Sequence, residues 1–363
     1  MALPAVFVAG LHLRWDGVWQ RPHHLLSRVA RTVPVVVVEE PLGSHEDRDD
    51  VRVDGAVTIV RPLRRRGWSP PLLDATTLAT VRAVIAELTL GASATGAGPA
   101  GAWLYTPVML ELVDALGARP LVYDVMDELA QFDHAPEGMV ENERALLERA
   151  DLVFAGGRSL YAKRAALGAK VRCEPSGVAF ERFSADVAPH PLPAQLRGPV
   201  FGYVGVIDER LDLDLIAALA DAFPAGHVVL VGPVVKLDPA RLPRRTNLHL
   251  TGGISYDALP SWLAGFDVAL MPFARNRATE FISPTKTLEY FAAGKPVVST
   301  GITDVVAEFA DAAFIADGAA AFVAAARAAL SPAPERVARG VAHARVRSWD
   351  AIAARMIDAV AAL

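Results

Sequence analysis

The side chains best spaced for chemistry lie in one short stretch, where Ser283, Lys286 and Glu289 follow one another at intervals of three. Residues three apart share one face of a helix. Ser283 is a good N-cap, Pro284 suits the first helical position and Gly294 suits the C-terminal cap, so the stretch predicts a helix. The positive helix start and Lys286 suit an anion, and Glu289 suits a sugar hydroxyl. The alternative is a surface helix with a Lys286–Glu289 ion pair.

A second cluster is the loop of residues 10–24, which is rich in Trp, His and Arg. It follows a continuously apolar stretch at residues 5–9, which predicts a buried strand, and it leads into a predicted helix. Ligands of doubly wound sheets bind at such strand ends. The loop lacks the Gly-x-Gly-x-x-Gly fingerprint, which argues against a dinucleotide cofactor. Its alternative role is packing, with the tryptophans as anchors.

A third cluster is acidic and consists of Asp124, Asp127 and Glu128, at the end of a predicted strand at residues 121–125. Carboxylates at this place can accept hydrogen bonds from sugar hydroxyls or take up a proton. A metal site is the weaker interpretation, because the segment has no Asp-x-Asp pair. The remaining alternative is that these acids cap the next helix.

Two series of alternating strands and helices must position these clusters. The first series ends at a proline-rich connection, Pro189–Gly198, and the second begins with the apolar stretch at residues 200–204. The pattern predicts an α/β protein of two facing Rossmann-like domains, at residues 1–188 and 189–345, with a final helical segment at residues 346–363. The strand ends of both domains are expected to line a cleft. Further strands are expected at residues 35–38, 57–60, 102–105, 151–155, 228–231, 267–272 and 297–298.

Composition excludes several classes of function. The net charge of −5 argues against a general nucleic-acid binder, and the single cysteine, Cys173, excludes an internal disulfide and a multi-cysteine metal site. No apolar run is long enough to span a bilayer and no basic leader precedes the first strand, so we expect a cytoplasmic protein. The basic and aromatic run from Arg61 to Trp68 is typical of a solvated loop, with peripheral contact to an anionic membrane or an acidic acceptor as the alternative.

Three segments resemble signatures of the GT-B glycosyltransferases, specifically of glycosyltransferase family 4. Residues 15–25, Trp-Asp-Gly-Val-Trp-Gln-Arg-Pro-His-His-Leu, are similar to the Trp-x-x-x-x-Gln-Arg-Pro-x-His-Leu first loop of one bacterial subgroup. Residues 123–129 resemble the acidic segment of that subgroup, and residues 283–298 resemble the nucleotide-sugar helix, the most specific of the three. The tail from Trp349 resembles the GT-B helix that crosses back onto the first domain. The similarity covers nearly the whole chain.

This resemblance implies a retaining enzyme that moves a sugar from a nucleoside-diphosphate-sugar, UDP- or GDP-linked, to a hydroxyl of a glycan, a lipid-linked acceptor or a small molecule. It implies no bound metal and no further cofactor. Glu289 would bind the ribose hydroxyls, and Lys286 and Arg210 would neutralise the diphosphate. Asp127 would touch the transferred sugar or the acceptor. The backbone groups of Pro284, Thr285 and Thr287 would meet the diphosphate, and the first-domain loop would approach it at Gly17. Phe273 and Ser283 complete the donor-site candidates. The acceptor-side residues would be Trp15, Arg21, His23, His24, Asp124 and Glu128.

One position departs from the family's pattern. Many members carry two glutamates with seven residues between them, the second equivalent to Glu289. Counting back gives Phe281, and Glu280 stands one step earlier. Because the first glutamate usually contacts the donor sugar, this departure leaves the donor sugar open.

Three other functions remain as alternatives. A sugar-nucleotide epimerase of the same plan would use Asp127 with His23 or His24 as acid and base. A non-catalytic GT-B subunit would explain the displaced glutamate. An NAD enzyme ranks last because the glycine fingerprint is missing. The oligomeric state is left open.

Overall fold

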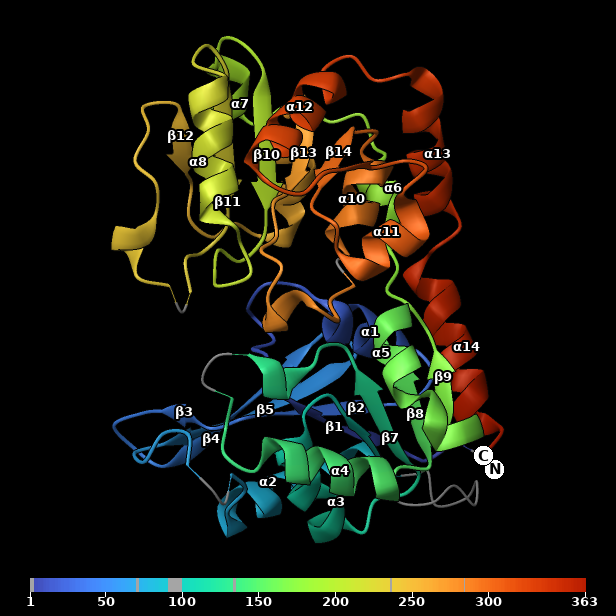
Figure 1. The fold of residues 1–363 in the computed structure, drawn as a ribbon. Coiled ribbons are helices and arrows are strands. Elements are labelled where there is room, and N and C mark those ends of the chain that lie inside the picture. Colours follow the sequence, from blue (N-terminus) through green and yellow to red (C-terminus); the bar gives the residue numbers. More distant parts are fainter. Residues whose placement is uncertain (1–2, 70–71, 91–99, 133–134, 236, 284) are drawn as a thin grey trace. The chain divides into compact units, whose positions relative to one another are not determined.

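The computed structural model describes residues 3–69, 72–90, 100–132, 135–235, 237–283 and 285–363. The chain forms two compact units (Figure 1). Unit 1 comprises residues 1–175 together with 349–363, and unit 2 comprises residues 176–348. The sequence analysis expected the first boundary near residue 189 and the final segment from residue 346. Pro284, expected at the start of a helix, lies outside the described residues.

Unit 1 is built on a mostly parallel sheet with the strand order β3-β5-β2-β1-β6-β7-β8-β9. The central strands are mostly apolar and fully buried, as expected where helices cover both faces of a parallel sheet, and the exceptions are the buried carboxylates Glu39 of β2 and Asp124 of β7. The strands are β1 (Phe7–Leu11), β2 (Val35–Glu39), β3 (Leu42–Gly43), β4 (Arg48–Asp54), β5 (Val57–Arg64), β6 (Gly101–Leu104), β7 (Leu121–Val125), β8 (Leu152–Ala155) and β9 (Val171–Cys173).

A hairpin that the sequence did not predict widens this sheet at one edge. β4 pairs antiparallel with β5, from Arg48 opposite Leu63 to Asp54 opposite Val57. The residues of β4 are mostly charged, and aspartate in particular is uncommon in strands, so the sequence of this segment did not predict a strand. The pairing extends β5 to Arg64. Arg61 and Arg64 therefore lie in a strand, which corrects the expectation of a solvated loop there.

The C-terminal helix belongs to unit 1, as predicted. It begins at Trp349 and packs on α1. Asp350 forms salt bridges with Arg28 at 3.1 Å and Arg31 at 2.8 Å, and the Trp349 ring stacks on His24 with centroids 4.8 Å apart. The helices of unit 1 are α1 (Arg21–Val29), α2 (Ala75–Leu88), α3 (Leu110–Leu116), α4 (Met139–Arg149), α5 (Arg158–Arg164) and α14 (Trp349–Ala361).

Unit 2 repeats the architecture with a parallel sheet of order β12-β11-β10-β13-β14-β15. Its core joins apolar strands to the inward faces of the helices. The strands are β10 (Val200–Val204), β11 (His227–Val231), β12 (Leu248–Leu250), β13 (Val268–Met271), β14 (Val297–Ser299) and β15 (Phe314–Ile315). The helices are α6 (Phe180–Phe183), α7 (Pro191–Gln195), α8 (Leu213–Ala222), α9 (Leu259–Ala264), α10 (Lys286–Ala292), α11 (Thr303–Phe309), α12 (Ala319–Ala329) and α13 (Pro334–Arg345).

Each sheet has one point where the strand order reverses. In unit 1, β1 lies between β2 and β6, and in unit 2, β10 lies between β11 and β13. Crevices at the carboxyl ends of such strands are where open α/β sheets bind ligands. The loop of residues 12–20 follows β1, and the loop of residues 205–212 follows β10, so both lie at these points.

Helix α10 starts later than the sequence predicted and ends where expected. Thr285, not Ser283, is the N-cap residue, and the first helical residue is Lys286. At the other end the N–H of Gly294 donates to Phe291 and that of Lys295 to Tyr290, both at 2.9 Å. Gly294 has a φ of +66°, which favours glycine. This Schellman motif ends the helix shortly before β14, which confirms the C-terminal cap that the sequence predicted at Gly294.

Candidate functional site

The buried face of α10 is locked onto the strand ends of unit 2. The Thr287 hydroxyl donates to Met271 Sδ at 3.1 Å, and the Tyr290 hydroxyl accepts the Val204 N–H at 2.9 Å. Met271 ends β13 and Val204 ends β10, the two strands at the reversal point. These contacts fix the helix, so that Lys286 and Glu289 occupy its less buried side. Thr287, predicted as a donor-site residue, therefore turns its side chain to the core.

Lys286 extends over the loop that follows β10. Its ammonium lies 5.9 Å from the centre of the Tyr203 ring, within the range of a cation–π contact. A Cβ on Gly205 would stand 2.2 Å from Lys286 Cε and 2.9 Å from Nζ. Gly205 also has a φ of +142°, which other residues rarely adopt. Glycine at this position leaves the space that the lysine side chain fills.

Glu289 is a half-buried carboxyl that makes no hydrogen bond or salt bridge with any other described residue. Burial raises the pKa of its side chain from 4.5 to about 7, and the charge of Lys286 only partly opposes this shift. A desolvated carboxyl without hydrogen bonds is costly. Functional sites often contain such groups, because a ligand can supply the missing partners.

Arg210 is held in place by its own loop. Its guanidinium binds Asp208 through Nε at 2.9 Å and through the terminal nitrogen at 2.7 Å. The loop is bonded to both neighbouring loops, by Ile207 N–H to the Pro233 carbonyl at 2.9 Å and by Ala274 N–H to the Arg210 carbonyl at 2.8 Å. Arg210 is therefore a preorganised cation whose charge Asp208 partly balances.

The other donor-side candidates differ in accessibility. Phe273 is buried and meets Tyr203 edge-on, with centroids 6.3 Å apart, so it supports the ring beneath Lys286. Ser283 and Thr285 are half-buried in the segment that leads into α10. Gly17, in the other unit, is exposed, and its N–H donates to the Arg14 carbonyl at 3.0 Å in a tight turn.

Arg21 and Asp124 form a buried ion pair in unit 1. Arg21 Nε lies 2.9 and 3.1 Å from the two Asp124 oxygens, and another guanidinium nitrogen donates to the Glu174 carbonyl at 2.8 Å. Both side chains are at most 2% exposed. Burial raises the pKa of Asp124, and the Arg21 charge opposes the shift. The pair joins α1 to β7 and has no surface on which an acceptor could bind.

Glu128 is also used inside unit 1. Its buried carboxylate forms salt bridges with Lys163 and Arg164 of α5. Arg164 further contacts Glu143 at 2.6 Å, and Glu143 accepts the Tyr123 hydroxyl at 3.0 Å. Asp127, one residue earlier, is half-buried. Of the acidic cluster, Asp124 and Glu128 are therefore committed to ion pairs within unit 1.

The two histidines of the first loop are packed. His23 is fully buried, its Nδ1 accepts the Gln20 N–H at 3.1 Å, and its Nε2 lies 3.1 Å from the Arg14 carbonyl. These partners require a proton on Nε2, and burial lowers the pKa of His23, so the ring is neutral. His24 is 4% exposed and lies against Trp19 and Trp349. Trp15 is buried as well, and its indole N–H donates to Asp54 at 2.8 Å.

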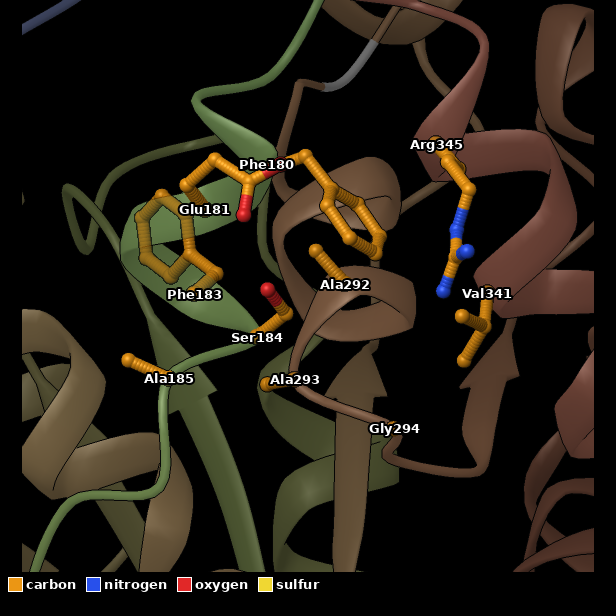
Figure 2. A pocket seen from close by; sticks show the side chains of 10 residues that line it. All are labelled: Phe180, Glu181, Phe183, Ser184, Ala185, Ala292, Ala293, Gly294, Val341 and Arg345. Atoms are coloured by element: carbon orange, nitrogen blue, oxygen red, sulfur yellow. The ribbon is translucent and has the colours of Figure 1, made fainter.

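A cavity of about 550 Å³ lies in unit 2 at the opposite end of α10 (Figure 2). Ala292, Ala293 and Gly294 form one wall, and the Arg345 guanidinium stands 5.2 Å from the Phe180 ring centre on another. Since it lies at the C-terminal end of the helix, it does not contain Lys286 or Glu289. We place the candidate site at the strand ends and not in this cavity.

Two features of the site were missed by sequence reasoning. Gly205 and Tyr203 both contact the position of the Lys286 side chain. In the sequence they indicated only a strand that is followed by a glycine. Tyr290 lay within the predicted helix without an assigned role, although it anchors that helix. Within the described part of the chain, no three His, Cys, Asp or Glu side chains gather so as to hold a metal ion. No helix among those residues is long and apolar enough to cross a membrane.

Comparison with known proteins places this geometry in context. The family model described as "Glycosyl transferases group 1" matches residues 198–332, the segment that contains Arg210, Lys286 and Glu289. A Bacillus subtilis (strain 168) protein, TuaH, provisionally named a teichuronic acid biosynthesis glycosyltransferase, is 31% identical over 169 residues. That match spans 44% of this chain and 43% of the relative, less than half of either.

Solved structures are similar over nearly the full length. Sucrose-phosphate synthase from Thermosynechococcus elongatus has a TM-score of 0.72 at 16% identity, and 98% of each chain is covered. An Escherichia coli structure described as trehalose-6-phosphate bound with UDP-2-fluoro glucose has a TM-score of 0.67 at 13% identity, with 99% of each chain covered. At these identities the likeness concerns the fold. Residues 198–332 therefore match the glycosyl transferases group 1 model, and the whole chain has the fold of the GT-B glycosyltransferases.

Proposed function

We propose that this protein transfers a sugar from a nucleoside-diphosphate-sugar to a hydroxyl acceptor, with retention at the anomeric carbon. The observation that carries the proposal is the Glu289 carboxyl, half-buried, with a pKa raised to about 7 and with no hydrogen bond to another described residue. It lies in the segment that matches the group 1 transferases. Vicinal hydroxyls, such as those of a ribose, would supply the hydrogen bonds that this carboxyl lacks.

The cations beside Glu289 suit the departing diphosphate. Lys286 is one helical turn before Glu289, and Arg210 belongs to the loop after β10, the strand to which Tyr290 fastens the helix. Fixed positive charges stabilise the negative charge that grows on a leaving diphosphate. Asp127 and Gly17 of the other unit are proposed to contact the transferred sugar or acceptor and the diphosphate. The protein supplies no nucleophile in this scheme, since the acceptor hydroxyl attacks.

The substrates are proposed at the level of classes. UDP- and GDP-sugars are the first donors to test, and the solved structure with UDP-2-fluoro glucose favours beginning with uridine. The acceptor is a hydroxyl of a glycan, a lipid-linked acceptor or a small molecule, and the TuaH match favours a glycan acceptor such as an intermediate of teichuronic acid biosynthesis. Contact with a membrane surface gains little support from the basic run. Arg61 and Arg64 are both committed to carboxylates, so they do not form a free cationic patch.

The epimerase alternative loses its base. Both His23 nitrogens are used by the backbone, and His24 is packed between two tryptophans. Incubation of UDP-glucose without an acceptor tests this directly, because an epimerase would convert the sugar nucleotide itself. A transferase would release UDP, slowly with water and faster with a suitable acceptor.

A thermal-shift screen with UDP, GDP, ADP and dTDP and their glucose or mannose derivatives tests the proposal. A ligand that binds the native state raises its stability by RT ln(1 + [L]/Kd). We expect at least one nucleotide to raise the melting temperature, and Glu289→Ala to remove most of the shift. Asp221→Ala is the matched control, since it removes an exposed carboxylate of the same unit, and it should keep the full shift. An undiminished shift in Glu289→Ala would refute the role of Glu289.

A further inference from the structure

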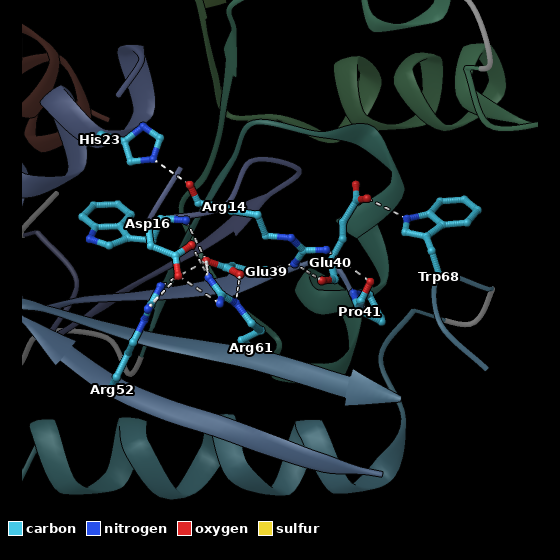
Figure 3. Close-up of polar contacts among 10 residues, drawn as sticks. Arg14, Asp16, His23, Glu39, Glu40, Pro41, Arg52, Arg61 and Trp68 are labelled. Carbon is cyan, nitrogen blue, oxygen red and sulfur yellow. Dashed lines mark hydrogen bonds and ion pairs between the residues drawn. The ribbon is translucent and has the colours of Figure 1, made fainter. Parts of the chain in front are cut away.

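Glu39 is a fully buried carboxylate at the end of β2, and it lies among polar residues of the loop 12–20 and of the β4–β5 hairpin (Figure 3). One oxygen accepts the backbone N–H of Trp15 at 2.8 Å. Arg14 reaches the other oxygen at 3.2 Å, and Arg61 of β5 donates to both, through Nε at 2.5 Å and a terminal nitrogen at 3.1 Å. A single side chain thus joins two consecutive loop residues to the sheet.

The same network holds the next loop residue from the side. Arg61 also binds Asp16, at 2.7 and 3.1 Å, and Arg52 of β4 approaches Asp16 at 3.0 Å. The Arg61 and Arg52 hydrogen bonds lower the pKa of Asp16, so Asp16 is ionised at neutral pH. The β4–β5 hairpin that the sequence did not predict therefore acts as a frame. Its two arginines connect the loop to Glu39.

These contacts determine where Gly17 lies. Arg14, Trp15 and Asp16 are each held, and the Gly17 N–H then closes a turn onto the Arg14 carbonyl at 3.0 Å. A Cβ on Gly17 would stand only 3.0 Å from that carbonyl oxygen. His23 of α1 donates its Nε2–H to the same Arg14 carbonyl, which fixes the turn from a second side. The loop is built to hold an exposed backbone segment still.

We infer that Glu39 is a positioning residue of the transfer reaction: through Trp15, Arg14 and Arg61 it holds residues 12–17, which include the Gly17 that the proposed function assigns to the donor diphosphate. This inference rests on the function proposed above. Glu39 itself is buried and touches no substrate. Preorganised loop groups need no rearrangement as charge develops, so loss of the anchor should lower turnover more than donor binding.

A neighbouring ion pair provides the matched control. Arg64 of the same hairpin binds Asp49 at 2.7 Å, with both side chains at most 4% exposed, and Asp49 also accepts the Thr80 hydroxyl at 2.6 Å. This pair fastens the hairpin to α2 and makes no contact with residues 12–20. Asp49→Asn therefore weakens a buried arginine–carboxylate pair of the same kind without touching the loop.

The first experiment is hydrogen exchange on the full chain, wild type against Glu39→Gln and Asp49→Asn. Glutamine keeps the shape and removes the charge. We expect the Trp15 and Gly17 amides to exchange at least ten-fold faster in Glu39→Gln and to remain unchanged in Asp49→Asn. If Glu39→Gln does not fold, Arg61→Lys serves instead, because it keeps the charge and loses the fork that joins Glu39 to Asp16. Unchanged exchange at these amides would overturn the inference.

The second experiment measures nucleotide release from UDP-glucose, GDP-mannose, ADP-glucose and dTDP-glucose, with rates normalised to nucleotide-binding sites. We expect kcat to fall ten- to a hundred-fold in Glu39→Gln while the donor KM changes less than three-fold. A general loss of folded protein would lower the number of sites and would appear in Asp49→Asn as well. Unchanged kcat despite faster exchange would overturn the reaction role. Absence of nucleotide binding by the wild type would instead refute the proposed function, and with it this role.

Discussion

Two regions carry candidate carboxylates, one at the end of strand β7 in unit 1 and one on helix α10 in unit 2, and the two environments differ. After β7 in unit 1, Asp124 and Glu128 are paired with arginine and lysine in the interior. In unit 2, Glu289 is half-buried, with a raised pKa and no hydrogen bond from another described residue. From the sequence both regions were candidates for binding sugar hydroxyls, because each places carboxylates where a ligand could reach them.

The difference shows how to separate structural from functional acids. A buried carboxylate with a bidentate arginine has its hydrogen bonds satisfied, so removal of the arginine destabilises the fold and the carboxylate is not available to a ligand. A desolvated carboxyl without such partners destabilises the fold, and a bound ligand can supply the hydrogen-bond donors that the carboxyl lacks. The comparison makes opposite predictions for the two regions, in stability and in nucleotide binding.

The largest expected effect is on stability in unit 1. Arg21→Ala would leave Asp124 buried without its cation, and breaking such a pair costs about 3–5 kcal/mol. Chemical denaturation measures the loss. Arg119→Ala, which removes an exposed pair with Asp151 at 3.1 Å, should cost less than about 1 kcal/mol. A small loss in Arg21→Ala would mean that this pair is not structural and would return Arg21 to the list of acceptor-side candidates.

The next largest effect concerns the space that Lys286 fills. Gly205→Ala would place a methyl group 2.2 Å from Lys286 Cε, so the ammonium must move. We expect nucleotide affinity to fall about ten-fold, ~1.4 kcal/mol, by calorimetric titration. Gly294→Ala is the control, because Gly294 also has a positive φ but has open space around its Cβ position. It should lose stability by about 1–3 kcal/mol from backbone strain and keep its affinity.

The pH dependence of donor binding tests the state of Glu289. With a pKa of about 7, the carboxyl is mostly protonated at pH 6 and mostly ionised at pH 8. If the ionised form accepts the ribose hydroxyls, affinity for UDP-glucose should rise about ten-fold between these two values. UDP-glucose is preferred to UDP because its diphosphate does not titrate in this range. In Glu289→Gln the affinity for UDP-glucose should no longer change with pH. If the change with pH persisted in this variant, another group would be responsible for it.

The smallest effect is a gain in stability. The pKa of Glu289 is higher in the folded state than its ordinary value of 4.5, so its favourable contribution is present below pH 4.5 and is lost as pH rises through 7. At pH 8 wild type therefore carries an ionised, desolvated carboxylate. Glu289→Gln should equal wild type in stability at pH 4.5 and exceed it by about 1 kcal/mol at pH 8, less than the ~3.4 kcal/mol of the full pKa shift because water partly screens this half-buried carboxyl. Asp221→Asn, at an exposed carboxylate, should show no such gain.

Local sequence signals predicted much of the fold. Short apolar runs marked β1, β2, β7, β8, β10, β11 and β13, and Gly294 marked the end of α10. Signals failed where a long-range partner decided the outcome. The charged segment of β4 becomes a strand because β5 pairs with it, and α10 begins at Lys286 although Ser283 is the better N-cap. Element ends are set by tertiary contacts as much as by propensity.

The sequence by itself determined that this chain has two Rossmann-like units and that Lys286 and Glu289 share a helix face, because periodicity and caps act between near neighbours. Only the tertiary structure decided which polar residues are already satisfied. Arg21 and Asp124 are 103 positions apart in the sequence. Glu39, at the end of β2, binds Arg61 of the neighbouring strand β5. Such pairs depend on strand order, which no local pattern encodes. A buried charged side chain that is paired within the protein holds the fold together, whereas a buried one without such a partner is a candidate for binding a ligand.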